Sequence, residues 1–130
     1  MGHTVKRIDE MEAIFHGAFR RAAAELGVES FGMQIFDLPP GYQDYPEHDH
    51  SEDGQEEVYV VLRGSAEFQV DGESVPVDGE RLLRVASGTK RKLVPGAEGV
   101  RILAIGGASG KLYERPESFK LGAPDPTAAG

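Results

Sequence analysis

The chain has 130 residues, of which 39% are hydrophobic and 28% charged, a composition typical of one globular domain with a single hydrophobic core. The formal net charge of −8 disfavours binding to phosphate backbones and to anionic lipid headgroups, so we expect no nucleic-acid and no membrane partner. Cysteine is absent, which excludes disulfides, thiolate metal sites and cysteine nucleophiles. The sequence has neither an apolar run of the roughly 20 residues that span a bilayer nor the apolar core of a signal peptide near its start. We therefore expect a cytoplasmic protein.

Residues 1–30 are predicted to form a helical extension. Apolar residues recur at spacings of three and four between Ile8 and Leu26, which is the period of an amphipathic helix. Asp9 is a suitable N-cap, and Gly27 is a suitable C-terminal stop. The charged residues of this segment fall largely on the other side of the helix and are expected to face water: Glu10, Glu12, Arg20, Arg21 and Glu25.

After Ser30 the pattern changes to short apolar runs separated by turn residues, and Asp71-Gly72 marks a two-residue hairpin. The predicted strands are 31–38, 57–63, 65–70, 73–77, 81–85, 90–94 and 100–105. Several short strands at this spacing predict a β-sandwich or a β-barrel, so the expected fold class is mainly β with one N-terminal helix. The apolar signal fades after Gly106. Residues 107–130 are expected to be a C-terminal extension that ends in a flexible tail.

The residues with the clearest chemical signal are His48, His50 and Glu57. Two positions apart on a strand, the histidines point to the same face, and imidazole is the commonest metal-ligating side chain. Glu57 opens the next predicted strand, and two histidines with one carboxylate form a facial triad that leaves open positions on a metal. The alternative is a solvated acidic loop without a ligand role. The acidic residues around the pair are expected to be solvated: Glu47, Asp49, Glu52, Asp53 and Glu56.

The strand that begins at Glu57 is apolar on both faces. Its inward face is predicted to carry Glu57, Tyr59 and Val61, and its outer face Val58, Val60 and Leu62. A strand that is apolar on both faces must be covered on both sides. The outer face is therefore expected to pack against the N-terminal helix or against a second subunit, and the second possibility predicts a homodimer.

The run of Gly41, His48, His50, Glu57 and Gly64 resembles the first conserved motif of the cupin superfamily, although the gap between His50 and Glu57 is about two residues longer than usual. The second motif is degraded. Gly79 and Gly88 match it, Ala86 stands where proline is usual, and Arg91 stands where the family has its remaining ligand histidine. The resemblance covers about Phe31 to Ile105. It implies a small single-domain cupin-type β-barrel, a double-stranded β-helix or jelly roll, in residues 31–106.

Arg91 decides what the resemblance implies for a metal. A guanidinium stays protonated and has no lone pair to give an ion. The phase of the strand turns Arg91 inward together with Leu93. Two outcomes remain open. Arg91 pairs with Glu57 in place of the metal charge, and the barrel is then metal-free. Otherwise it lies near the barrel mouth, where it anchors an anionic substrate while the three remaining ligands hold a divalent ion such as Fe, Mn, Ni or Zn.

The resemblance implies a barrel that binds a small anionic metabolite, and no single activity. If the protein is an enzyme, it is a metal-dependent oxygenase, isomerase or lyase of the cupin type. The alternatives are a metal-free ligand-binding barrel and a structural barrel with a vestigial site. The residues expected to contact the ligand are Arg91, Tyr59 and Phe68, the last two also as core residues. Tyr42 and Tyr45 flank the histidines and are expected at the rim. No residue is assigned a catalytic role.

Overall fold

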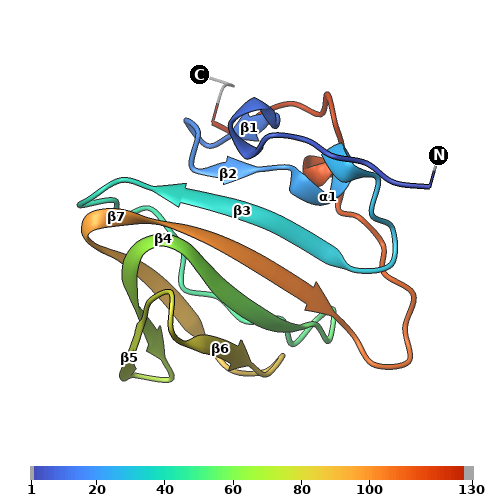
Figure 1. The fold of residues 1–130 in the computed structure, drawn as a ribbon. Coiled ribbons are helices and arrows are strands. Elements are labelled where there is room, and N and C mark those ends of the chain that lie inside the picture. The colour runs from blue at the N-terminus through green and yellow to red at the C-terminus, as the bar shows by residue number, and fades with distance from the viewer. Residues whose placement is uncertain (1, 128–130) are drawn as a thin grey trace.

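The computed structural model describes residues 2–127 (Figure 1). The elements in chain order are a 3-10 helix Ile8–Glu10, β1 (Ala13–Ile14), β2 (Phe19–Arg20), α1 (Ala22–Leu26), β3 (Gly32–Leu38), β4 (Glu56–Val70), β5 (Glu73–Val77), β6 (Leu82–Val85), β7 (Arg91–Gly107) and a 3-10 helix Glu117–Phe119. All strand pairs are antiparallel. Among the described residues, no helix has the length and apolar character that crossing a bilayer requires.

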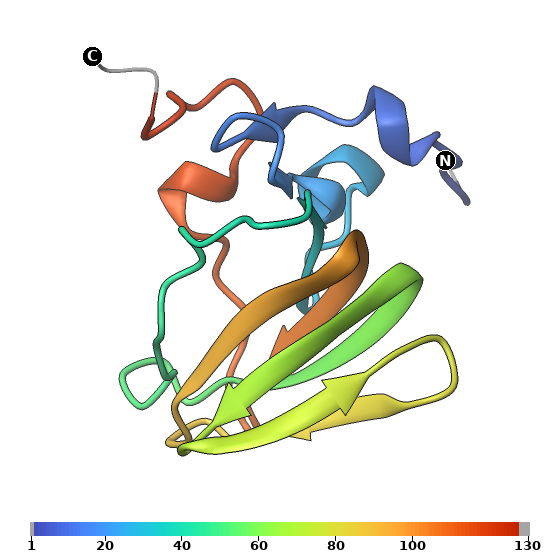
Figure 2. The same cartoon turned by 90° about the vertical axis from the view of Figure 1, so that its left-hand side faces the viewer.

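Two long strands, β4 and β7, each contribute to two layers of sheet (Figure 2). In one layer, the first half of β4 lies between β6 and the second half of β7. The second half of β7 pairs in turn with β3, and β2 and β1 follow in the same layer. The second half of β4 lies between β5 and the first half of β7. The mainly β class predicted from the sequence is confirmed, and the strand 73–77 has the predicted bounds.

Glycines allow the two long strands to bend together. The register of β4 and β7 shifts between Val61 and Arg63 and again between Gly64 and Ala66. Gly64 has φ +79°, and a Cβ at this position would clash with the carbonyl oxygen of Gly99. The sequence predicts a break between two strands at Gly64, but this residue forms a bulge within one strand, where a left-handed conformation and a close backbone approach both require glycine.

The core fills the space between the two layers. Tyr59 and Phe68, on the two halves of β4, have ring centroids 4.5 Å apart, and both are almost completely buried, with Leu93 and Ile102 beside them. The predicted phase of β4 is confirmed, because Tyr59 is 1% exposed whereas Leu62, on the other face, is 45% exposed.

The N-terminal helix that the sequence predicts is much longer than the helix observed. Only Ala22–Leu26 is α-helical, and it ends at Gly27 in the left-handed conformation, as predicted. The preceding residues form the hairpin of β1 and β2, and β2 pairs with the edge of β3. This pairing uses backbone groups that a continuous helix would need for itself. The apolar residues of the segment still turn toward the sheet, since Met11 and Ala22 pack on Ile35.

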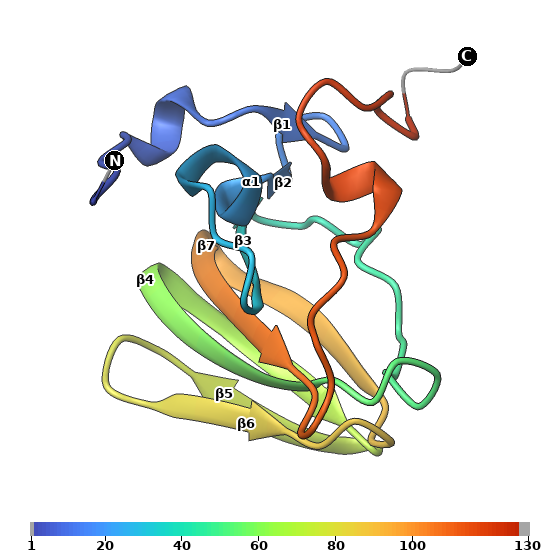
Figure 3. The same ribbon diagram turned by 90° about the vertical axis from the view of Figure 1, so that its right-hand side faces the viewer.

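Arg21, which the sequence predicts on the solvent side of a helix, connects the N-terminal and C-terminal segments through its guanidinium. Arg21 is 1% exposed and donates hydrogen bonds to the carbonyl oxygens of Ser118 (3.0 Å) and Pro124 (3.4 Å), and it also pairs with Glu12. Figure 3 shows the C-terminal segment beside the N-terminal one. The expected flexible tail includes residues 128–130, which lie outside the described residues, and the division at residues 30 and 106 stays a prediction.

Candidate functional site

His48 and His50 lie in the extended segment between β3 and β4, and two sets of backbone hydrogen bonds hold this segment in place. His48 and Arg91 exchange both bonds of a β-bridge, at 3.0 and 2.9 Å. The amide of His50 donates to the carbonyl oxygen of Ser87 at 2.7 Å. The two imidazole centroids lie 5.1 Å apart, so the rings are neighbours on one side of the segment, as their spacing predicts.

The structure brings the three predicted ligands together. One ligand atom from each of His48, His50 and Glu57 lies within 4.8 Å of the other two. Nε2 of His50 is 3.1 Å from Oε1 of Glu57. Glu57 reaches this position because it points inward at the start of β4.

Each imidazole has its Nδ1 engaged by an oxygen. Nδ1 of His48 lies 3.0 Å from the carbonyl oxygen of Pro46, and Nδ1 of His50 lies 3.1 Å from a carboxylate oxygen of Asp53. A proton on Nδ1 donated to these oxygens leaves Nε2 with its lone pair toward the cluster. The sequence predicts Asp53 in a solvated loop without a role in the site. Asp53 follows His50 by three residues, and this spacing was the only indication of the contact in the sequence. The contact itself depends on the turn that brings Asp53 back toward the imidazole of His50.

Glu57 is held by two neighbours on the same oxygen. The hydroxyl of Tyr59 donates to Oε1 at 2.6 Å, and His50 contacts the same atom. Burial alone would raise the pKa of Glu57, but hydrogen bonds from His50 and Tyr59 outweigh it and lower that pKa below its ordinary value. The hydrogen bond with Glu57 raises the pKa of His50, against the opposing effect of burial. Both shifts favour a charged His50–Glu57 pair in the metal-free protein.

Arg91 points inward, as predicted, and is 0% exposed beside Leu93. Its Nη2 donates to the carbonyl oxygens of Ala86 (3.1 Å) and Val85 (3.5 Å). Neither expected position for its guanidinium is observed. Within residues 2–127 it forms no ion pair with Glu57, and it lies in the core instead of at the mouth, because the carbonyl groups at the end of β6 bind it there. Its positive charge still contributes to the lowered pKa of Glu57.

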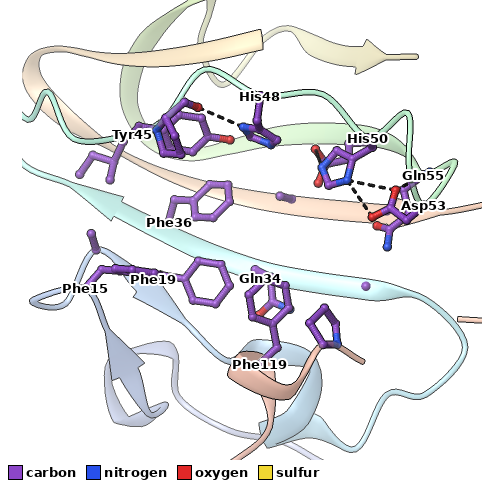
Figure 4. A pocket seen from close by; sticks show the side chains of 18 of the residues that line it. Phe15, Phe19, Gln34, Phe36, Tyr45, His48, His50, Asp53, Gln55 and Phe119 are labelled. Carbon is purple, nitrogen blue, oxygen red and sulfur yellow. Dashed lines mark hydrogen bonds and ion pairs between the residues drawn. The ribbon is translucent and has the colours of Figure 1, made fainter. Parts of the chain in front are cut away.

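His48 and His50 lie at one end of a cavity of about 480 Å³ (Figure 4), which Glu57 also lines. Asp53 and Gln55 line the same end, whereas most of the remaining wall is aromatic. The aromatic lining residues are Phe15, Phe19, Phe36, Tyr42, Tyr45, Tyr113 and Phe119. Tyr42 and Tyr45 therefore line the cavity, as expected from their positions beside the histidines.

The expected ligand contacts of Tyr59, Phe68 and Arg91 are not seen, since none of the three lines the cavity. All three are buried in the core between the layers. The cavity wall includes Ala104, which lies opposite Tyr59 in the β4–β7 register. In place of these three, the structure brings to the cavity residues that the sequence analysis had not selected, including Gln34 on β3.

No model of a protein family matches this sequence, and no curated protein matches it. Solved structures do match. A cupin protein from Bacteroides fragilis is 21% identical, with a TM-score of 0.66, over 89% of this chain and 92% of that one. A protein described as a sugar phosphate isomerase from a cupin superfamily, from Silicibacter pomeroyi, is 19% identical, with a TM-score of 0.67, over 82% and 76%. The cupin domain of an XRE-family transcriptional regulator from Enterobacter cloacae is 22% identical, with a TM-score of 0.53, over 68% and 87%.

At these identities the likeness establishes the fold. The chain has the cupin fold in a small single-domain form, as the first motif indicated. Within that fold, the group of His48, His50 and Glu57 has the donor atoms to hold a metal ion.

Proposed function

We propose that the protein binds one divalent metal ion through His48, His50 and Glu57 and acts on a small molecule in the adjoining cavity as a metal-dependent enzyme. The observation that carries this proposal is the convergence of three donor atoms within 4.8 Å at the end of a cavity. Two imidazoles and one carboxylate suit Fe, Mn, Ni or Zn and leave coordination positions for a substrate.

The surrounding hydrogen bonds fit an ion at this position. Pro46 and Asp53 engage the Nδ1 atoms of the two imidazoles, which leaves their Nε2 atoms as donors. Both hydrogen bonds of Glu57 involve Oε1, which leaves Oε2 for an ion. A bound ion supplies Lewis-acid polarisation of a substrate oxygen.

The protein's own groups prepare this site. The proton that Nε2 of His50 shares with Oε1 of Glu57 must leave before this nitrogen can act as a ligand. Tyr59 fixes the orientation of the carboxylate through its 2.6 Å hydrogen bond. The buried charge of Arg91 helps to keep Glu57 ionised, because it lowers the pKa of that carboxyl.

The expected anionic metabolite depended on Arg91 reaching the ligand. Arg91 does not line the cavity, so this contact does not support a negative charge on the substrate. The proposed ligand is therefore a small molecule held by the metal and by the cavity wall.

A second candidate function is a metal-free ligand-binding barrel. The observation in its favour is that His50 and Glu57 already satisfy one another as a charged pair, with the buried charge of Arg91 nearby. In that protein the proton stays between the two side chains, and the cavity binds its ligand without an ion.

Metal analysis distinguishes the two functions. Protein purified without a histidine tag is supplied with Fe, Mn, Ni or Zn, dialysed and measured by mass spectrometry of the elements. We expect about one ion per chain. Changing His50→Ala or Glu57→Gln should remove most of it, whereas His3→Ala, an exposed histidine far along the chain from the site, should not. An absence of bound metal under all four conditions would contradict the proposal and favour the metal-free barrel.

A further inference from the structure

The cavity wall carries negative charge with little positive charge to balance it. Three carboxylates line the cavity, those of Asp44, Asp53 and Glu57, and among the described residues that line it there is no lysine and no arginine. Nδ1 of His50 lies 3.1 Å from Asp53, and its Nε2 lies 3.1 Å from Glu57. For the exposed carboxylate of Asp44, the structure shows no ion pair and no hydrogen bond within residues 2–127. Asp44 is therefore available to a bound molecule.

Asp44 faces the cavity together with the two histidines. Asp44, Pro46, His48 and His50 fall at alternate positions of the segment between β3 and β4, and all four line the cavity. Alternate residues of an extended chain face the same way. The four residues from Asp44 to His48 span at most about 14 Å, so one small organic molecule can contact both side chains.

A continuous row of aromatic rings lines the cavity beside these residues. The ring centroids of Tyr45 and His48 lie 5.6 Å apart, those of Phe36 and Tyr45 5.5 Å, and those of Phe19 and Phe36 5.6 Å. Figure 4 shows Tyr45 beside His48, with Phe19 and Phe119 on the other side of the cavity. The face of an aromatic ring carries negative potential, which attracts a cation within about 6 Å of the ring. The rings and the carboxylates therefore favour the same sign of charge on a ligand.

Tyr42 and Asp44 combine the two features. Tyr42 also lines the cavity, and burial and the negative charge of Asp44 both raise its pKa. The ring of Tyr42 thus lies within electrostatic reach of the carboxylate. A cation at this position is attracted by both groups, whereas an anion is repelled by both and an uncharged group gains from neither.

The aromatic character of the wall decides which kind of cation fits. A primary ammonium group has three N–H donors, and a buried donor without an acceptor is costly. The phenylalanine rings of the wall offer no such acceptor. An ammonium group whose nitrogen carries alkyl groups has no need of one, and its carbon atoms pack against the rings.

Gln34 adds a hydrogen-bond donor to the same cavity. It is 7% exposed and lines the cavity. Its Oε1 is buried without a partner among the described residues, so the accessible end of the amide is Nε2. A group that donates from the wall is matched by an oxygen atom of the ligand. The cavity therefore suits a polar molecule that has both a cation and an oxygen acceptor.

We propose that the ligand of this cavity carries an alkylated ammonium group, which lies between Asp44 and the aromatic rings, and an oxygen atom that accepts a hydrogen bond from Nε2 of Gln34. The inference rests on the proposed function in taking this cavity as the substrate site, but its contacts require no metal. Asp44 and Tyr42 are then specificity-determining residues, because they distinguish a cation from an uncharged molecule of the same shape.

Two probe molecules of the same shape test the charge of the ligand. Acetylcholine has a trimethylammonium group and a carbonyl oxygen, and 3,3-dimethylbutyl acetate has a carbon atom in place of the nitrogen. Calorimetry measures the dissociation constants of both, with the zinc-loaded and with the metal-free protein. We expect the cation to bind about tenfold more tightly. A merely apolar cavity would prefer the uncharged ester, because a cation must be desolvated to enter it. Equal binding, or tighter binding of the uncharged ester, would overturn the proposal.

Variants assign the preference to the cavity wall. Asp44→Asn and Tyr42→Leu should each weaken acetylcholine binding about fivefold and leave binding of the uncharged ester unchanged, which also reports that the variant is folded. Glu47→Gln is the matched control, since Glu47 is an exposed acidic residue of the same segment that does not line the cavity. If Glu47→Gln reduces the preference as much as Asp44→Asn does, the acidic surface in general attracts the cation and the proposal is wrong.

Gln34→Met tests the contact with the oxygen atom. It removes the donor and keeps the length of the side chain, so it should weaken both esters by the same factor of about five and leave the preference for the cation unchanged. Unchanged binding of both esters would show that the ligand oxygen does not contact Gln34.

The same measurements separate this inference from the proposed function. If the protein binds no metal but prefers acetylcholine in a way that depends on Asp44, the metal proposal fails and this inference stands. If the protein binds zinc through the triad but shows no preference for the cation, the metal proposal stands and this inference fails.

Discussion

Nε2 of His50 lies 3.1 Å from Oε1 of Glu57, and the pKa shift of each group favours its charged form. Two of the three proposed ligands therefore hold one another in position before an ion binds. Asp53 extends this arrangement, because its carboxylate contacts the other nitrogen of the same imidazole at 3.1 Å. A metal site built this way depends on residues that do not touch the ion.

The first prediction concerns Asp53. Changing Asp53→Asn should weaken zinc binding about 10- to 100-fold, since the amide no longer accepts the Nδ1 proton as a charged group and the imidazole loses orientation and basicity. Competition with a chromophoric chelator measures the affinity. Glu52→Gln is the matched control, because Glu52 is an exposed acidic neighbour, and removing its charge should have little effect. Equal affinities of the Asp53→Asn protein and the wild type would show that this contact does not support the site.

The second prediction concerns Asp37 and the stability of the sheet. Asp37 on β3 accepts hydrogen bonds from Arg101 and Arg20, both at 2.6 Å. Burial alone would raise the pKa of Asp37, but these hydrogen bonds outweigh it and lower that pKa. A carboxyl group whose pKa is lower in the folded than in the unfolded chain stabilises the fold above the unfolded value, about 3.9. This contribution is lost as the pH falls through the folded value.

Asp37→Asn should therefore lower the free energy of unfolding by about 1–3 kcal/mol at neutral pH, and less in high salt. The difference from the wild type should shrink between about pH 5 and about pH 2. Urea denaturation across this range measures it. Glu67→Gln, on the exposed side of β4, is the control and should change stability little. A deficit that stays constant down to about pH 2 would mean that packing, and not the charge, is responsible.

Much of the fold follows from local patterns. The alternation along β4 indicated that Tyr59 points inward and Leu62 outward. The expectation that Arg91 and Leu93 share the inward face gave the orientation of β7. The hairpin turn is also local, since Asp71 and Gly72 both adopt positive φ, which is the conformation that this dipeptide favours. His48, His50 and Glu57 were recognisable because their spacing resembled that of a known motif.

The parts that the sequence analysis missed depend on distant partners. The apolar spacing of residues 8–26 is compatible with a helix, but the free edge of β3 binds Phe19 and Arg20 as a strand. Gln34 looks like an ordinary polar residue in an apolar strand, and its place in the cavity wall depends on residues that lie far apart in the sequence. Arg91 was placed on the correct face, but the carbonyl groups that hold it could not be foreseen.

The third prediction is a homodimer through the outer face of the sheet. The N-terminal segment covers this face near Ile35 and Met33, but Val58 and Val60 are only half-buried and Leu82, which lies opposite Val60, is 73% exposed. Exposed apolar side chains on neighbouring strands of a sheet favour contact with another apolar surface. Light scattering should show a dimer for the wild type and a monomer for Val60→Glu, with Glu67→Gln again dimeric. A monomeric wild type would contradict this prediction.

The fourth prediction concerns Arg91, which stands where the cupin motif that this sequence resembles has a further ligand histidine. His48 and Arg91 form a hydrogen-bonded pair across the β-bridge, so side chains at the two positions stand next to one another. Arg91→His should therefore place a third imidazole beside the triad and tighten zinc binding about tenfold or more. Chelator competition measures the gain.

Arg91→Met is the matched variant, because it removes the charge and keeps much of the volume without adding a ligand. Two nitrogens of Arg91, Nε and Nη1, are buried without a hydrogen-bond partner among the described residues. Replacing such a buried charge with an apolar side chain is often neutral or stabilising, so the methionine variant should fold. If it binds zinc as tightly as Arg91→His, the gain comes from removing a positive charge near the ion. If only the histidine variant gains affinity, Arg91 occupies a position from which an imidazole reaches the metal.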